Sequence, residues 1–185
     1  MSGFHYLILS LLMLTLTLAC SDESTSVNPN GVTNMISNSS FEDLDGPTTY
    51  GWLVDEELAG FEDDMPPGGG EWSLVLNHGM PPEWGWARTF VIDQPGEHIY
   101  CLTSWAKSTG VGGAIYFGKW SNNEWVQEKH VMVPVDADNW TEYQIIDTIN
   151  VQSADSLGIT LWGYGLEVEP GSVLFDLIEL RKLDQ

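Results

Sequence analysis

The chain is rich in tryptophan, a residue whose flat ring can bind ligands by stacking. Its 185 residues include nine Trp. A pyranose ring presents C–H faces that pack on an indole, while its hydroxyl groups need hydrogen bonds from nearby polar side chains. A shallow sheet surface with several exposed aromatic rings would therefore suit a sugar. Six of the Trp are candidates for such a surface: Trp84, Trp86, Trp105, Trp120, Trp125 and Trp162.

Strand periodicity indicates which rings point away from the core. In "SLGITLWGY", Leu157, Ile159 and Leu161 share one face, and Trp162 and Tyr164 share the other. The same alternation in "HIYCLTSWAK" directs its Trp outward. The outward residues predict a binding face, although sandwich cores also bury Trp. The complete predicted site contains Trp84, Trp86, Trp105, Tyr116, Trp162 and Tyr164, with Arg88 for polar contacts.

The motifs of common catalytic centres are missing from the sequence. The chain has no HExxH zinc motif, no GxSxG nucleophile elbow and no phosphate-binding loop in which Lys follows the glycines. Its acids concentrate in turns and in the segment 55–72. A jelly-roll glycosidase would need paired acids on one catalytic strand. We therefore predict a protein that is not an enzyme, and a glycosidase is the least favoured hypothesis.

The elements that must position these residues are strands. Short runs rich in β-branched and aromatic residues are separated by Gly, Pro, Asn and Asp, and no helical periodicity of useful length appears. This pattern predicts an all-β fold, an antiparallel β-sandwich. The expected strands are residues 72–76, 87–92, 98–106, 114–119, 124–133, 141–149, 157–163 and 174–181.

Four segments carry a more specific pattern. They are "ISNSSFEDLDG" with the following "GW", "QPGEHIYCLTSWAKSTG", "DNWTEYQIIDTINVQSADSLGITLWGYG" and "SVLFDLIEL". In order and spacing, over about Met35 to Leu183, they resemble carbohydrate-binding modules of the xylan- and glucan-binding jelly-roll type, in the galactose-binding-like superfamily. The resemblance implies that the first and last strands lie close together. It also implies that Trp52, Trp72 and Trp140 lie in the core.

The same resemblance implies a structural Ca²⁺. In modules of this type, an acid after the first buried Phe and an acid in the closing strand commonly hold the ion. The matching residues are Glu42, after Phe41, and Asp176, with Asp43 as a reserve ligand. Ca²⁺ takes about six to eight oxygen ligands, so backbone carbonyls would have to contribute. Leu177 stands where the family often has a second Asp. The alternative is that both acids are exposed, or that Glu42 binds backbone amides.

The amino-terminal residues have the features of an export signal. The run "LILSLLMLTLTLA" is shorter than a membrane span of about 20 residues and has the length of a signal-peptide core. The Ala19-Cys20 junction resembles a bacterial lipobox, and the "SDE" after it resembles the export signal of surface lipoproteins in the Bacteroidetes. We expect a signal peptide over 1–19, lipidation of Cys20, a tether over 20–33 and one domain over 34–185. The alternatives are an ordinary cleaved signal and an N-terminal anchor.

The charge of the chain restricts its partners. Asp and Glu number 27 against six Lys and Arg, which gives a net charge of -21. Such a field repels nucleic acid and anionic lipid headgroups, so no nucleic-acid partner is expected and lipid on Cys20 is the only expected membrane contact. A neutral sugar or a divalent cation is compatible with it, and a well-hydrated surface is the simplest explanation. With Cys20 lipidated, Cys101 would be a lone core thiol without a disulfide.

Two functional hypotheses from different classes follow. The first is a non-catalytic lipoprotein of the outer membrane or cell surface, or of the periplasmic side, that binds poly- or oligosaccharides on a concave aromatic sheet face. The second is a module that docks a protein partner of an envelope complex, which would then cover the same aromatic face.

Overall fold

The structure, a computed structural model, describes residues 33–45, 48–49, 51–77, 84–164 and 171–183. The expected signal peptide, the Cys20 lipidation site and nearly all of the expected tether lie outside these residues. Within the described ranges, no helix has the length and hydropathy that a membrane span requires.

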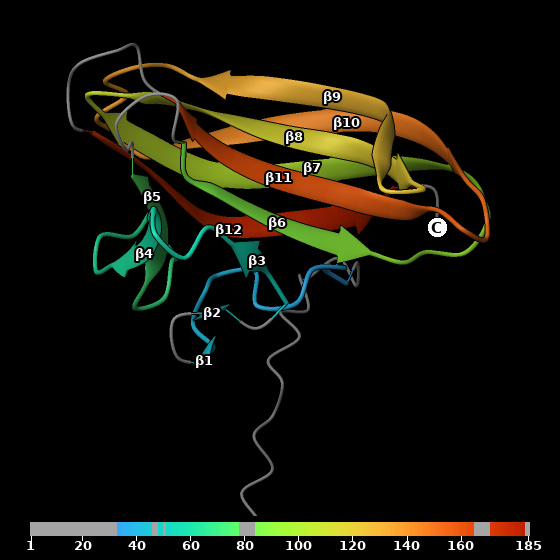
Figure 1. Ribbon diagram of the computed structural model, residues 1–185, viewed down its shortest axis with the longest axis horizontal. Helices are drawn as coiled ribbons and strands as arrows, with labels where there is room; N and C mark the ends of the chain where they lie inside the picture. Colours follow the sequence, from blue (N-terminus) through green and yellow to red (C-terminus); the bar gives the residue numbers. More distant parts are fainter. Residues whose placement is uncertain (1–32, 46–47, 50, 78–83, 165–170, 184–185) are drawn as a thin grey trace, which may run out of the picture.

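Two five-stranded antiparallel sheets form the domain, and their long strands lie along the long axis of the molecule (Figure 1). We call one of them the front sheet. Its strands have the order β3 (Leu53–Val54), β6 (Trp86–Val91), β11 (Ser156–Tyr164), β8 (Gly112–Ser121) and β9 (Glu124–Val133). The other, which we call the back sheet, has the order β10 (Thr141–Val151), β7 (Gly96–Thr109), β12 (Ser172–Lys182), β5 (Ser73–Asn77) and β4 (Ala59–Glu62). A separate short pair joins β1 (Leu44–Asp45) to β2 (Thr48–Thr49). The predicted β-sandwich and all eight predicted strands are confirmed.

Alternation along the strands builds the core between the sheets. On β11, Leu157, Ile159 and Leu161 are fully buried, as their shared parity predicts. The back sheet contributes Tyr100 and Leu102 from β7, which are equally buried. Because each sheet uses one face of its strands for this core, the opposite face of each sheet is left for solvent or a ligand.

The amino-terminal segment closes the core against the last strand. Phe41 is fully buried and its ring lies 5.3 Å from that of Trp52, which is buried too. The Met35 N–H donates to the Leu180 carbonyl at 2.9 Å, so the segment lies beside β12 as expected. Trp72 and Trp140 were expected in the core, but both are only half-buried. Trp140 lies at the surface, where its indole N–H donates to Asp64 at 3.0 Å.

Candidate functional site

The outward face of the front sheet carries aligned aromatic and polar residues. Antiparallel register places Trp86 opposite Trp162 on the neighbouring strand. Because directly opposite residues share a sheet face, the alternate positions along β6, β11, β8 and β9 form rows across the sheet. The first row is Trp86, Trp162, Ala114 and Met132; the second is Arg88, Thr160, Tyr116 and His130; the third is Phe90, Gly158, Gly118 and Glu128.

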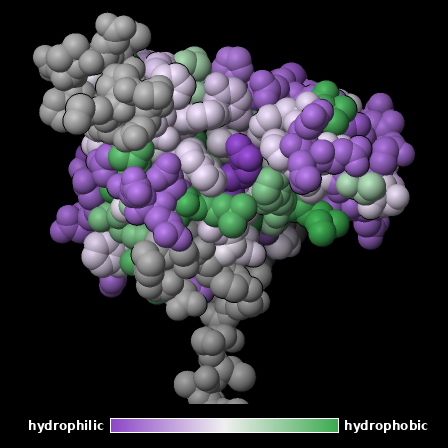
Figure 2. Space-filling view, in the orientation of Figure 1, coloured by the Kyte–Doolittle hydropathy of each residue, from purple (hydrophilic) through white to green (hydrophobic). Residues whose placement is uncertain are grey.

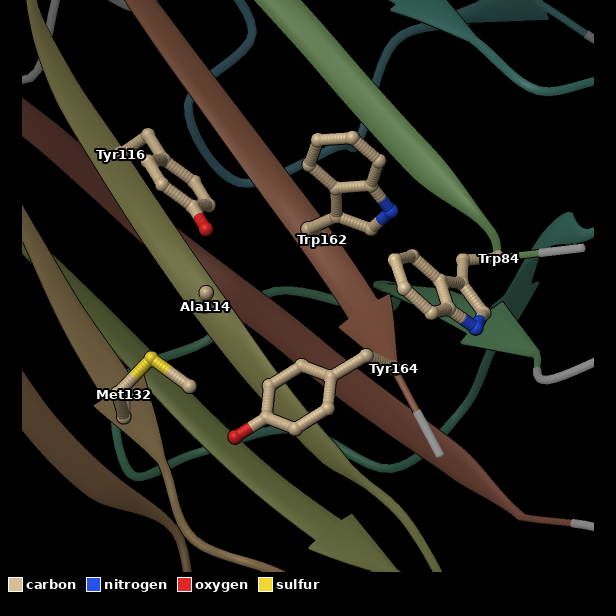
Figure 3. Close-up of a pocket in the computed structure, with 6 residues that line it drawn as sticks. All are labelled: Trp84, Ala114, Tyr116, Met132, Trp162 and Tyr164. Carbon is tan, nitrogen blue, oxygen red and sulfur yellow. The ribbon is translucent and has the colours of Figure 1, made fainter. Parts of the chain in front are cut away.

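A pocket of about 210 Å³ opens on this face. Ala114 is the smallest residue in its lining, between the larger side chains of β8, β9 and β11 (Figure 3). None of the lining residues carries a carboxylate, an amine or a guanidinium. The pocket is therefore a nearly apolar, ring-walled depression, and its lining consists of Trp84, Ala114, Tyr116, Met132, Trp162 and Tyr164.

The rings of the pocket hold one another in edge-to-face contacts. The Trp162 ring lies 6.1 Å from Trp84 and 6.2 Å from Tyr116, at interplanar angles of 73° and 64°. Tyr116 also contacts His130, with ring centroids 5.2 Å apart. Such arrangements are favoured by the ring quadrupoles. Trp84 is 41% exposed, so a large apolar ring meets solvent at the mouth of the pocket. We call the rings of Trp84, Tyr116 and Trp162 the pocket cluster.

A second group of rings lies further along the same face. Trp120 contacts Trp125 at 5.2 Å and Phe90 at 5.5 Å between ring centroids. We call these three residues the distal cluster. A Cβ added to Gly158 would come within 2.8 Å of the Trp125 Cη2 atom. Trp125 can therefore lie across β11 only because residue 158 has no side chain.

We expect Gly158→Ala to displace the Trp125 ring and to destabilise the fold by about 1–3 kcal/mol, the usual effect of overpacking. Chemical denaturation measures this loss, and near-ultraviolet circular dichroism reports the Trp120–Trp125 geometry. In a Trp125→Ala background the same substitution should be nearly neutral. An equal loss of stability in both backgrounds would show that Gly158 is needed for another reason.

Arg88 lies between the two clusters. Its Nε donates to the Thr160 hydroxyl at 2.8 Å. Its guanidinium carbon lies 4.9 Å from the Trp120 ring centroid and 5.7 Å from that of Trp86, within the range of cation–π attraction. Burial lowers the pKa of Arg88 from its ordinary value, but a guanidinium remains charged at any physiological pH. The charge is therefore fixed in position between aromatic rings.

The structure brings most of the predicted sugar-site residues together but separates one. Trp84, Trp86, Arg88, Tyr116, Trp162 and Tyr164 share the outward face of the front sheet. Trp105 lies on β7 of the back sheet, opposite Glu142 and Asp176 in the register. Strand parity distinguishes core-facing from outward-facing residues, but it does not say which sheet a strand joins. Sequence reasoning missed Ala114 and Met132, because small and aliphatic residues are ordinary in strands.

The two acids expected to hold Ca²⁺ lie beside the same loop. A Cβ on Gly69 would come within 2.6 Å of Asp176 Oδ2, and one on Gly70 within 2.2 Å of the Glu42 carboxylate. Glu42 accepts backbone N–H groups from Glu71 at 2.9 Å and Trp72 at 3.0 Å. Only glycine lets the backbone approach both carboxylates this closely.

Asp176 is the unusual member of this acid pair. It is fully buried, and Oδ1 accepts the Leu177 N–H at 2.6 Å while Oδ2 has no hydrogen-bond partner in the described chain. Burial raises the pKa of Asp176 to about 7, and the negative charge of Glu42 contributes. Asp43 is exposed, and its backbone, rather than its carboxylate, is bonded to Asn38.

This acid pair fits a cation only with help from the backbone. The described residues contain no group of three or more His, Cys, Asp and Glu that could hold a metal ion. A buried carboxylate oxygen without a partner, next to a second carboxylate, is nevertheless an environment that a divalent cation would neutralise. Glu42 and Asp176 would be its side-chain ligands, and backbone carbonyls would have to provide the others.

No protein-family model and no curated protein matches the sequence. Solved structures match its fold. The enzymatically active domain of tailspike protein 4 from bacteriophage CBA120 is 18% identical with a TM-score of 0.63, over 81% of this chain but 21% of that one. TmCBM61, solved with beta-1,4-galactotriose, is 18% identical with a TM-score of 0.57, over 81% of this chain and 99% of that one. A family 16 carbohydrate-binding module is 22% identical with a TM-score of 0.54, over 80% and 99%. The chain therefore has the jelly-roll fold of carbohydrate-binding modules.

Proposed function

We propose that the protein binds a poly- or oligosaccharide on the outward face of the front sheet and does not catalyse its turnover. The observation that carries this proposal is the pocket cluster, whose rings are already assembled around a pocket of about 210 Å³. A sugar ring would pack on these rings through its C–H face. Preassembled rings lose little conformational entropy on binding, which favours affinity.

The polar residues of the same face complement this stacking. Sugar hydroxyl groups need donors and acceptors close to the stacked ring, and Arg88 and the Tyr116 and Tyr164 hydroxyls lie on the same face. A non-catalytic role is supported by the pocket lining, which lacks the paired acids of a glycosidase. The solved complex of TmCBM61 with a galactotriose adds support for sugar binding on this fold.

We further propose that lipid on Cys20 attaches the domain to the cell envelope, at the outer membrane or cell surface. The apolar run ending at Ala19-Cys20 and the polar residues after it support this proposal. Metabolic labelling with a palmitate analogue tests it. Wild-type protein should incorporate label and a Cys20→Ser variant should not; equal labelling of both would contradict it.

A structural Ca²⁺ held by Glu42 and Asp176, with Asp43 nearby, is part of the same proposal. When bound, the ion would neutralise two adjacent carboxylates. The loop backbone at Gly69 and Gly70 already approaches these carboxylates closely, so the ion would fix this loop against β12. The pair lies at the back sheet, and we therefore expect its effect on stability to exceed its effect on sugar binding.

A glycan array, probed with and without chelator, tests the proposed function. We expect retention on at least one class of plant, microbial or host polysaccharide. Failure to bind any of them, together with a co-purifying envelope protein that is lost in Trp162→Ala, would instead establish the aromatic face as a protein-docking surface. Release of labelled oligosaccharide fragments would identify a glycosidase.

A further inference from the structure

Arg88 differs from the other Lys and Arg residues in its ion pairing. The chain has only six Lys and Arg among 27 acids. Five of the six are each paired with an Asp or Glu, and Arg88 has no acidic partner among the residues that the structure describes. The pairs are Lys107–Asp64, Lys119–Asp155, Lys129–Asp147, Arg181–Glu179 and Lys182–Asp93.

The environment of Arg88 makes this lack of a partner informative. A half-buried charge without a counter-ion is unfavourable, because it loses hydration without gaining an ion pair. The chain has 27 Asp and Glu, and hydrophilic residues gather on the left and right sides of the face drawn in Figure 2, so acids are plentiful elsewhere. The Thr160 hydroxyl and the rings of Trp86 and Trp120 fix the guanidinium in place instead. None of these contacts uses an Nη donor of Arg88, and within the described ranges those donors are left for a ligand.

The place of Arg88 on the face matches a ligand that spans both clusters. Arg88 stands opposite Thr160, which is two residues from Trp162 in one direction and two from Gly158 in the other. Two residues along a strand correspond to about 7 Å. The charge therefore lies one row from Trp162 of the pocket cluster and contacts Trp120 of the distal cluster, so a chain bound across both clusters would pass it.

We propose that the ligand is an acidic glycan whose anionic group, a uronate carboxylate or a sulfate ester, binds the guanidinium of Arg88 while neighbouring sugar rings stack on the two clusters. This inference rests on the proposed function. The planar guanidinium fork matches carboxylate and sulfate oxygens with paired hydrogen bonds. The net charge of -21 opposes a polyanion at long range, but salt screens such repulsion beyond about 8 Å, so the contact at Arg88 decides the preference.

Matched polymers test the inference without changing the protein. The protein's affinity for each acidic polymer is measured by calorimetry and compared with its affinity for the neutral counterpart. The carboxylate pairs are glucuronoxylan, polygalacturonate and alginate with their carboxyl-reduced forms, and the sulfate pair is carrageenan with its desulfated form. We expect at least one acidic polymer to bind about 10- to 100-fold more tightly than its neutral counterpart, the range expected for charge-assisted hydrogen bonds. The carboxylate and sulfate pairs identify which group is bound.

Variants of Arg88 provide the second measurement. Arg88→Gln should weaken binding of the acidic polymer far more than binding of its neutral form, so that the preference between the two is lost. Arg88→Lys keeps the charge but loses the fork and should retain only part of the preference. Binding of neutral and acidic polymers with equal affinity, lost in Trp162→Ala, would overturn this inference and leave the proposed function standing. Absence of binding to every glycan would overturn both.

Discussion

Replacing Trp162 with Ala should weaken glycan binding at least 30-fold and leave the fold intact. Trp162 is central to the pocket cluster, since its ring contacts both Trp84 and Tyr116. The substitution removes one stacking surface and the support of two others. Loss of a central aromatic residue from a binding site typically costs about 2 kcal/mol or more, which corresponds to roughly 30-fold in Kd. Affinity electrophoresis in polysaccharide-containing gels measures the loss, and circular dichroism verifies the fold.

Trp105→Ala is the matched control for this experiment. Trp105 is half-buried like Trp162 and faces away from the core, but it belongs to the back sheet. Its removal should therefore leave glycan retention within about twofold of wild type, because the two sheets are separated by a core about 10 Å thick. The converse result, with retention lost in Trp105→Ala and kept in Trp162→Ala, would place the site on the back sheet.

Without metal, the stability of the protein should fall as the pH rises from about 4 to about 7. Burial raises the pKa of Asp176 to about 7, whereas an unfolded Asp titrates near 3.9. The folded state therefore binds a proton that the unfolded state has lost. The stabilisation is complete below about pH 4 and is lost as the pH passes through about 7. Three pKa units correspond to an effect on the order of 4 kcal/mol.

Asp176→Asn isolates this contribution from the general repulsion among acids. Asn keeps an acceptor for the Leu177 N–H and puts an uncharged amide where Oδ2 has no partner. In chelator at pH 8 the variant should be more stable than wild type, and near pH 4 the two should be alike. Ca²⁺ should raise the Tm of wild type at pH 8 and have little effect on the variant. Equal pH slopes, or an equal response to Ca²⁺, would contradict the assignment of Asp176.

Strand parity and turn residues were sufficient to predict the sandwich. Leu157, Ile159 and Leu161 alternate with Trp162 and Tyr164, and the structure buries the first three and leaves the other two on the opposite face. The inference works because a strand has a side-chain period of two whatever sheet it joins. Assembly of the strands into sheets depends on contacts between residues far apart in sequence. Strand parity therefore cannot predict that Trp105 lies on a different sheet from the rest of the site.

The finer features of the site depend on approach distances that a single sequence does not encode. A glycine in a strand gives no sign in the sequence that the Trp125 ring lies across it, as it does at Gly158. Likewise, nothing in the sequence indicates that the larger side chains around Ala114 leave a pocket there. The proximity of Glu42 to Asp176 was expected from the resemblance of the first and last segments. The loop at Gly69 and Gly70 that encloses both carboxylates was not.

Whether a glycan binds the aromatic face of the front sheet can be read from the indole N–H signals of the nine Trp in an NMR titration. The polysaccharide that binds best on the array, shortened to an oligosaccharide, is titrated into ¹⁵N-labelled protein. We expect shifts for Trp84 and Trp162, and for Trp120 and Trp125 if the oligosaccharide reaches the distal cluster, with Trp52 and Trp105 unchanged. Saturable shifts confined to Trp105 and Trp140, with Trp84 and Trp162 unmoved, would contradict it.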